Sequence, residues 1–241
     1  MVSRATLRLL AVMVVAMLAA WLVPAGGAHG AFFVVSNPTA SPPSIDGVVQ
    51  PGEWSGAGHV LVAGGVLMVM HDDLRLYMLL DATADPALEP PTGAFGGDFF
   101  NMSFDVNRDG LITPNLDVNY GLAQSNGQFG QQKYLGPGTL TGISFAINSF
   151  EAVGLGSSPN LASPHVAWEF SYDRTEITNF NSVLARMGFQ LQSEIPSFEV
   201  LQPANVFTDF SKMLEIAMVP EPATLAVLAL GGFALLRRPR P

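Results

Sequence analysis

The chain has 241 residues, contains no cysteine and carries a formal net charge of −9. The lack of cysteine excludes disulfide bonds, thiolate metal sites and cysteine nucleophiles. The negative charge argues against nucleic acid and anionic lipid as partners, because both require a basic surface on the protein.

Residues 1–30 have the three parts of a secretory signal peptide. Two arginines are followed by an apolar run at residues 9–23 and then by small residues. Signal peptidase requires small residues at the third and first positions before the cut, which fits cleavage before Ala31 or before His29. A retained membrane anchor is the alternative, but the run is short for a bilayer. We therefore expect a signal helix that is removed during export.

The middle of the chain, residues 31–218, is more acidic than the whole. It holds 19 acidic and 6 basic residues, a net charge of −13. A segment of this length can bury one sizeable core. Its charge favours cations and neutral polysaccharide as ligands. We divide it into a lead-in linker at residues 31–44 and a binding domain at residues 45–218.

Short apolar runs alternate with clusters of Gly, Pro, Asn and Asp in this domain, which predicts many short strands. Gly65–His71 and Leu74–Asp81 predict a hairpin whose turn is Asp72-Asp73. One short helix is expected at residues 181–187. Strands separated by turn signals at this spacing predict an all-β sandwich. Further strands are predicted at residues 99–105, 118–122, 142–147, 166–172, 188–192 and 212–218.

Several short motifs follow one another in this domain: Ile45-Asp46-Gly47, Pro51-Gly52-Glu53-Trp54, Asp73-Leu74-Arg75-Leu76-Tyr77 with Asp81, Asp98-Phe99-Phe100, Phe104 to Gly110, and Trp168-Glu169-Phe170-Ser171-Tyr172. Their order resembles that of the family 9 carbohydrate-binding module and its DOMON-like relatives. The resemblance implies a β-sandwich in which a Glu-centred strand precedes a short helical turn. Some members of the family bind the ends of sugar chains between aromatic rings, some relatives bind haem, and some only stabilise larger proteins.

The candidate sugar platforms are the rings of Trp54, Trp168, Tyr120 and Tyr134. Sugar rings stack their C–H faces on exposed aromatic faces. Both tryptophans lie inside motifs that would build the core, so a core role is the alternative interpretation. Sugar binding is thus implied by the resemblance rather than by the residues themselves.

A candidate metal loop lies at Asp105, Asn107 and Asp109, whose oxygen atoms stand at alternate positions before a glycine. This is how the start of an EF-hand loop places ligands around calcium. Leu116 occupies the position of the usual twelfth-position glutamate, with Asp117 one residue beyond. We expect a structural Ca²⁺ site formed by the three residues with Asp117. The alternative is a turn whose side chains cap their own backbone.

Three functions are compatible with these features. We favour a non-catalytic carbohydrate-binding or structural protein, because the sequence contains no nucleophile elbow, His-Glu-x-x-His motif or phosphate loop. A haem-binding electron carrier would need an axial pair such as His71 with Met68, Met70 or Met102. An envelope hydrolase would need a catalytic pair of carboxylates, which so acidic a chain offers by chance.

The C-terminus, residues 219–241, again has three parts. Pro220, Glu221 and Pro222 come first, followed by an apolar run of thirteen residues and an arginine-rich end. As a helix the run would be about 20 Å long, a marginal span for a bilayer core of about 30 Å. Arginines beyond it favour a cytoplasmic end. We expect a single hydrophobic helix that contacts the membrane at least transiently.

This tail resembles the PEP-CTERM sorting signal of bacteria that make exopolysaccharide. The resemblance implies recognition of the Pro-Glu-Pro motif by exosortase, a membrane-embedded, transpeptidase-like enzyme. It also implies export to the envelope, surface or extracellular matrix of a Gram-negative-type bacterium, with signal peptidase and exosortase as partners during export. A plain tail anchor is the alternative. A eukaryotic lipid-anchor signal lacks the basic end and requires small residues upstream.

Overall fold

The computed structural model describes residues 33–89, 97–123, 128–144, 148–178, 183–194 and 197–220. The predicted signal peptide and the sequence from Glu221 onward, with its predicted hydrophobic helix, lie outside these residues. Among the described residues, no helix has the length and apolar character needed to cross a membrane.

The described part of the chain is nearly all β, as the sequence predicts. One helical turn, α2 (Arg174–Ile177), follows β10. The strands are β1 (Phe33–Pro38), β2 (Gly58–Val62), β3 (Gly65–His71), β4 (Arg75–Ala82), β5 (Phe99–Phe104), β6 (Val118–Ala123), β7 (Gln128–Gly136), β8 (Thr139–Leu140), β9 (Phe150–Gly156), β10 (His165–Asp173), β11 (Leu184–Glu194), β12 (Ser197–Gln202) and β13 (Leu214–Met218).

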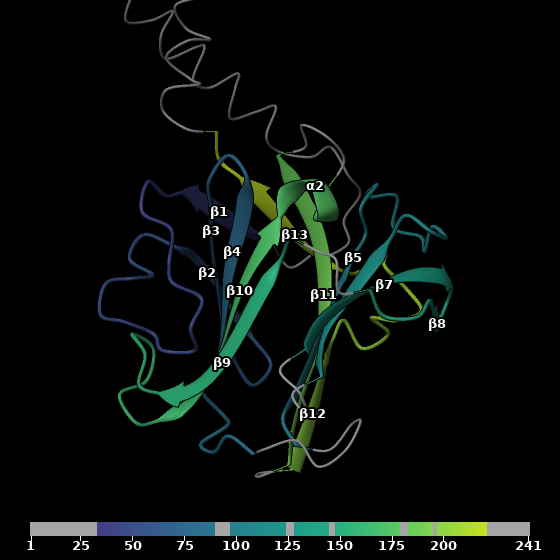
Figure 1. Cartoon of the computed structure of the whole chain (residues 1–241). Helices are drawn as coiled ribbons and strands as arrows, with labels where there is room; N and C mark the ends of the chain where they lie inside the picture. The colour runs from purple at the N-terminus through teal and green to yellow at the C-terminus, as the bar shows by residue number, and fades with distance from the viewer. Residues whose placement is uncertain are drawn as a thin grey trace, which may run out of the picture. The chain divides into compact units, whose positions relative to one another are not determined.

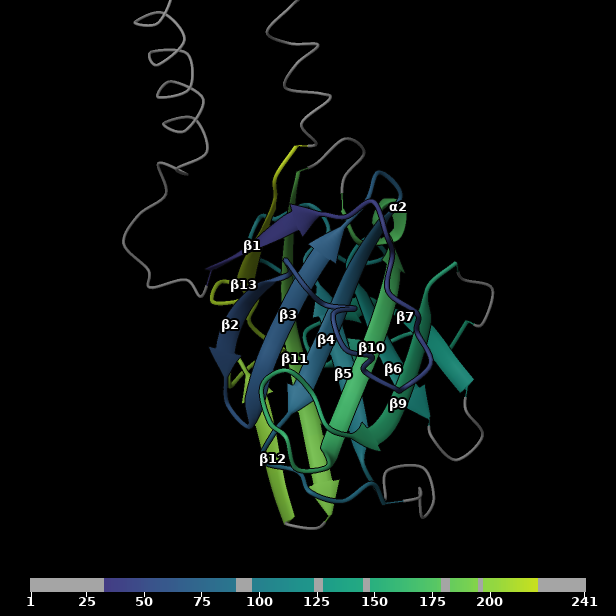
Figure 2. The same ribbon diagram turned by 90° about the vertical axis from the view of Figure 1, so that its left-hand side faces the viewer.

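The strands form two sheets that pack face to face (Figure 1). The first sheet has the order β7-β6-β5-β11-β13-β1, with β8 beside β7 and β12 beside β11. The second has the order β1-β3-β4-β10-β9, with β2 beside β3, and faces the viewer in Figure 2. β1 joins both sheets, because residues 33–36 pair with β13 and residues 37–38 pair with β3. The segment predicted to be a linker therefore contributes a strand.

Aromatic side chains fill the space between the sheets. Alternate residues of β10 point inward, as a strand requires, and bring Phe170 and Tyr172 against β5. The ring centroids of Phe100 and Phe170 are 4.7 Å apart, and those of Phe104 and Tyr172 are 5.1 Å apart. Such pairs contribute about 0.5–1.5 kcal/mol each beyond their buried area.

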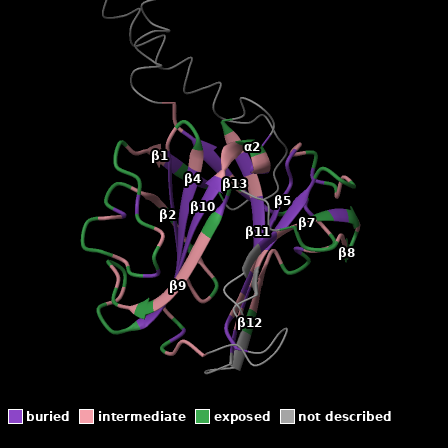
Figure 3. Cartoon of the chain, in the orientation of Figure 1, coloured by how far each residue is buried: buried purple, intermediate pink, exposed green. Residues whose placement is uncertain are grey.

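A further layer covers the outer face of the second sheet. The segment between β1 and β2 places Trp54 on Met68 and Met70 of β3 and on Leu79 of β4. β3, β4 and β10 are consequently buried on both faces (Figure 3). This explains why β3 and β4 are almost continuously apolar in sequence instead of alternating.

Most predicted strands are confirmed, and two expectations differ from the structure. The β3–β4 hairpin forms, and Asp72 Oδ1 accepts the backbone N–H groups of Leu74 and Arg75 in its turn. The helix predicted at residues 181–187 is wrong in its described part, because residues 184–187 are strand and pair with β13. Residues 142–144 form only an isolated bridge at Ser144, while 145–147 lie outside the described residues.

Candidate functional site

The four aromatic residues predicted as sugar platforms are core residues. The side chains of Trp54 and Tyr120 are 1% exposed, and those of Trp168 and Tyr134 are 0% exposed. A ring must present a free face to stack on a sugar. In this structure none of the four does so. The alternative interpretation given for the two tryptophans, a role in the hydrophobic core, therefore holds for all four residues.

Glu169 on β10 ties the covering segment to the second sheet. Its Oε1 accepts the indole N–H of Trp54 at 3.1 Å, and its Oε2 accepts the backbone N–H groups of Gly47 at 2.9 Å and Asp46 at 3.2 Å. Burial raises the pKa of Glu169, and these three donors oppose that shift. Three of the motifs that carry the family resemblance thus meet at one buried carboxylate, which gives them a structural role.

Phe150, at the start of the edge strand β9, is the better candidate for a sugar platform. Among the described aromatic side chains only Phe150, at 55%, and Phe33, at 46%, are exposed. The Arg75 guanidinium lies 5.0 Å from the centre of the Phe150 ring. Its Nη1 donates to the backbone carbonyl of Asn148 at 2.8 Å and to Ser171 Oγ at 3.0 Å. The ring is therefore held in place by a fixed cation while about half of it faces solvent.

Polar groups stand next to this ring. Glu176 Oε1 accepts the backbone N–H of Asn148 at 3.0 Å, and its Oε2 accepts the hydroxyl groups of Ser149 at 2.8 Å and Tyr120 at 3.0 Å. The hydroxyl groups of Ser149 and Tyr120 are buried and bonded to Glu176, so these contacts fix the backbone beside the ring rather than contact a ligand. Sequence analysis missed Phe150 because nothing in the pattern around it separates an exposed edge phenylalanine from the buried ones.

The predicted calcium loop is largely closed by its own hydrogen bonds. Asp117 accepts the N–H groups of Val106 at 2.9 Å and Thr113 at 2.6 Å. Asp109 Oδ1 accepts a backbone N–H at 2.7 Å, and Asn107 Nδ2 donates to Asp109 Oδ2 at 2.8 Å. Asp105 Oδ2 accepts from a backbone N–H and from an arginine, which leaves its buried Oδ1 without a partner in the described part of the chain. This pattern resembles the capped turn, and calcium at this loop stays a prediction.

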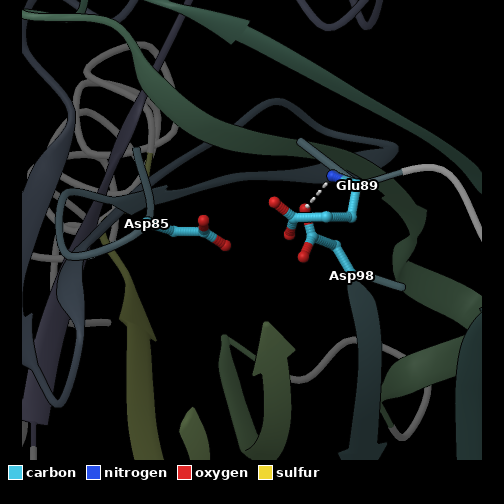
Figure 4. A group of neighbouring side chains, drawn as sticks. All are labelled: Asp85, Glu89 and Asp98. Carbon is cyan, nitrogen blue, oxygen red and sulfur yellow. Dashed lines mark hydrogen bonds between the residues drawn. The ribbon is translucent and has the colours of Figure 1, made fainter. Parts of the chain in front are cut away.

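A second acidic group, which the sequence did not reveal, comprises Asp85, Glu89 and Asp98 (Figure 4). One carboxylate oxygen of each lies within 4.8 Å of the other two, and no other such group of His, Asp and Glu occurs in the described ranges. Burial raises the pKa of Asp85 to about 6 and that of Asp98 to about 7. Asp85 and Glu89 lie in a Pro-containing stretch that reads as an ordinary loop, and only the fold brings Asp98 beside them.

The contacts of His71 and His165 do not support the alternative functions. The two ring nitrogens of His71 are hydrogen-bonded to Ser36 Oγ at 2.9 Å and to the carbonyl oxygen of Val219 at 3.0 Å, so axial haem ligation would have to break one of these bonds. Ser36 is fully buried and cannot meet a substrate. His165 and Ser158 both bond to Asp81 instead of to each other. A hydrolase triad requires an accessible serine bonded to a histidine that is in turn bonded to an acid. Neither Ser36 with His71 nor Ser158 with His165 and Asp81 meets this requirement.

No family model matches the sequence, and no curated protein matches it significantly. Solved structures do resemble the fold. The family 9 carbohydrate-binding module of Caldicellulosiruptor kristjanssonii in complex with cellotriose has a TM-score of 0.55 at 16% sequence identity, over 78% of this chain and 94% of that one. The same organism's module in complex with glucose has a TM-score of 0.54 at 16% identity, over 78% and 96% of the two chains. The chain therefore shares the fold of family 9 carbohydrate-binding modules.

Proposed function

We propose that the protein is an exported, non-catalytic carbohydrate-binding or structural protein of an exopolysaccharide layer. The observation that carries the proposal is the two-sheet sandwich, shared with modules solved in complex with glucose and cellotriose. The net negative charge of the middle of the chain disfavours anionic ligands and so supports a neutral polysaccharide. The proposed contact surface is centred on the half-exposed Phe150 ring.

The sorting part of the proposal rests on the two ends of the chain. The fold holds the backbone up to Val219, whose N–H donates to Ser36 O at 3.0 Å and whose carbonyl accepts from His71. Pro220 is the next residue, and Glu221 and Pro222 lie outside the described residues. An exosortase that recognises the Pro-Glu-Pro motif would act immediately after the last strand, and cleavage there would leave the sandwich intact. Signal peptidase would already have removed the N-terminal segment.

Binding of the purified exported protein to a glycan array, followed by calorimetry with the best neutral glycan, tests the ligand. We expect Phe150→Ala to weaken binding about tenfold, equivalent to about 1.4 kcal/mol, while Phe33→Ala leaves it unchanged. Absence of binding to every neutral glycan at millimolar concentration would contradict the carbohydrate proposal. Equal losses in both variants would contradict the assignment of the surface.

A further inference from the structure

Glu151 carries a carboxyl group that lies between the two sheets of the sandwich. The residue belongs to β9, the strand that ends the second sheet beside β10 (Figure 2). Glu151 is paired with Phe170 of β10, and residues directly opposite each other on neighbouring strands project to the same face. Because Phe170 belongs to the core between the sheets, the side chain of Glu151 points into that core. Phe150, the preceding residue, consequently faces outward.

The buried carboxyl group has no partner among the described residues. Both oxygen atoms of Glu151 are excluded from solvent and take part in no hydrogen bond within the described ranges, although the residue as a whole is half-buried. None of the ion pairs formed by the described residues includes it. A carboxylate charge without partners is costly in such surroundings. Burial accordingly raises the pKa of Glu151 well above its usual range, so the group is a neutral acid at pH values where exposed glutamates are ionised.

The surrounding titratable groups do not stabilise a negative charge at Glu151. Burial and the charge of Glu151 raise the pKa of Tyr172, on β10, well above its usual range. The ring centres of Tyr172 and Tyr120 of β6 are 4.9 Å apart, and burial also raises the pKa of Tyr120. Glu176, which accepts the hydroxyl group of Tyr120, is a second acid on this side. The guanidinium group of Arg75 lies over the outer face of β9 instead.

The position of Glu151 at the edge of a sheet gives its side chain a short route to solvent. In the described part of the chain β9 pairs with β10 on one side. At its start, Glu176 Oε1 accepts the N–H of Asn148, and Glu176 Oε2 accepts the hydroxyl group of Ser149. Strands with few neighbours open locally at a lower free energy than the core. A charge on Glu151 therefore favours opening at the start of β9 over unfolding of the whole sandwich.

We propose that the neutral carboxyl group of Glu151 holds the start of β9 against the sandwich, and that its ionisation releases this strand together with the Phe150 ring. The carboxyl proton passes to the solvent, and the side chain follows because water solvates the charge. The effect on ligand binding rests on the proposed sugar surface at Phe150. Release of the strand does not depend on that surface.

The pH range of the release follows from the direction of the pKa shift. In the open form Glu151 is exposed and titrates near the usual value of about 4.3. In the closed form its pKa is raised, so the stability linked to this shift is fully present below about 4.3 and is lost as the pH rises through the raised value. Within this interval the ratio of closed to open protein should fall by up to about tenfold for each pH unit.

Hydrogen exchange of the purified exported protein, measured from about pH 5 to about pH 8, above the usual glutamate value, tests the release. The protection factors of the β9 amides should fall by up to about tenfold per pH unit in the wild type. They should stay constant in Glu151→Gln, which cannot ionise. Glu199→Gln is the matched control, because Glu199 is an exposed glutamate on β12, and it should follow the wild type. Constant protection of β9 in the wild type, or the same fall in Glu151→Gln, would overturn the proposal.

Glu151→Leu is a second variant that keeps the test decisive if Glu151→Gln does not fold. An apolar side chain suits a buried position without hydrogen-bond partners, so Glu151→Leu should fold and should also show protection of β9 that does not change with pH. If neither variant folds, the carboxyl group has a structural partner, and the proposal is overturned.

Glycan binding distinguishes this proposal from the proposed function. If the wild type binds a neutral glycan, its affinity should fall together with the protection of β9 as the pH rises, whereas Glu151→Gln should retain its affinity. A constant affinity beside falling protection would overturn the link between β9 and the ligand surface. If no neutral glycan binds at any pH, the carbohydrate proposal fails, and hydrogen exchange still decides the role of Glu151.

Discussion

Replacement of the carboxyl group of Glu169 by an amide should destabilise the protein more than a comparable change at the surface. In Glu169→Gln the side-chain amide retains the shape but has one acceptor oxygen where the carboxylate has two. If that oxygen accepts from Gly47 and Asp46, the amide NH₂ faces the indole N–H of Trp54, and two donors oppose each other in a buried site. A buried donor left without an acceptor costs about 1–3 kcal/mol.

We therefore expect Glu169→Gln to lower the free energy of unfolding by about 2–3 kcal/mol. In a domain of this size that corresponds to a fall in melting temperature of about 4–12 °C. Differential scanning calorimetry of the exported protein measures it. Glu199→Gln is the control, because Glu199 is exposed on β12 and accepts from the side chain of Gln190, and surface changes ordinarily stay within about 0.5 kcal/mol. A Glu169→Gln variant that melts with the wild type would refute the anchoring role.

Other predictions concern the anchor, the packing and the tail. The double variant Trp54→Phe with Glu169→Gln should lose less stability than the sum of the two single changes, since both remove the same bond. Burial raises the pKa of Glu169 in the folded protein, so the stability linked to this shift is fully present below the unfolded pKa, about 4.3, and is lost as the pH rises through the folded pKa. The difference in unfolding free energy between the wild type and Glu169→Gln should therefore be smaller at pH 8 than at pH 4. The opposite trend would mean that the N–H donors lower the pKa more than burial raises it. Gly154→Ala should destabilise strongly in thermal unfolding, because a Cβ there would lie 1.9 Å from the carbonyl oxygen of Gly47, whereas Gly142→Ala, with open space around it, should not. Intact-mass measurement of the protein recovered from the cell surface should show that residues 225–241 have been removed. Glu221→Ala should leave uncleaved precursor in the membrane. A wild-type mass that includes the arginine-rich end would indicate a permanent anchor.

Local patterns in the sequence were sufficient where a strand lies next to its own partner along the chain. The β3–β4 hairpin is an example, because Asp72 closes its turn with side-chain acceptors and both flanking runs are apolar. β10 is another, and the turn of α2 follows it as the family resemblance implied. The failure at residues 184–187 has a different origin. Those residues have an intrinsic preference for helix, but pairing with β13 imposes an extended backbone that buries Ala185 and Met187.

The candidate sites were harder to predict, because their defining property is burial. Trp54 and Trp168 could have been platforms or core from their sequence positions, and the packing of the covering segment and of β5 decides the matter. The side chains of Asp105, Asn107 and Asp109 form a visible local pattern, yet most of their oxygens accept hydrogen bonds from within their own turn. Asp85 and Asp98 form no local pattern with each other, since they lie thirteen residues apart in the sequence.

The contrast between the two acidic groups follows from how a chain can satisfy carboxylates. A turn supplies backbone N–H groups within a few residues, so acids close in sequence are readily satisfied by the segment that contains them. Acids brought together from the ends of different strands have no such local supply, and their charge must be balanced by a proton, a basic side chain or an ion. Asp85 and Asp98 lack a basic partner in the described part of the chain, so only a proton or an ion can balance them. An ion binds with a stoichiometry and a selectivity among metals that a proton cannot reproduce.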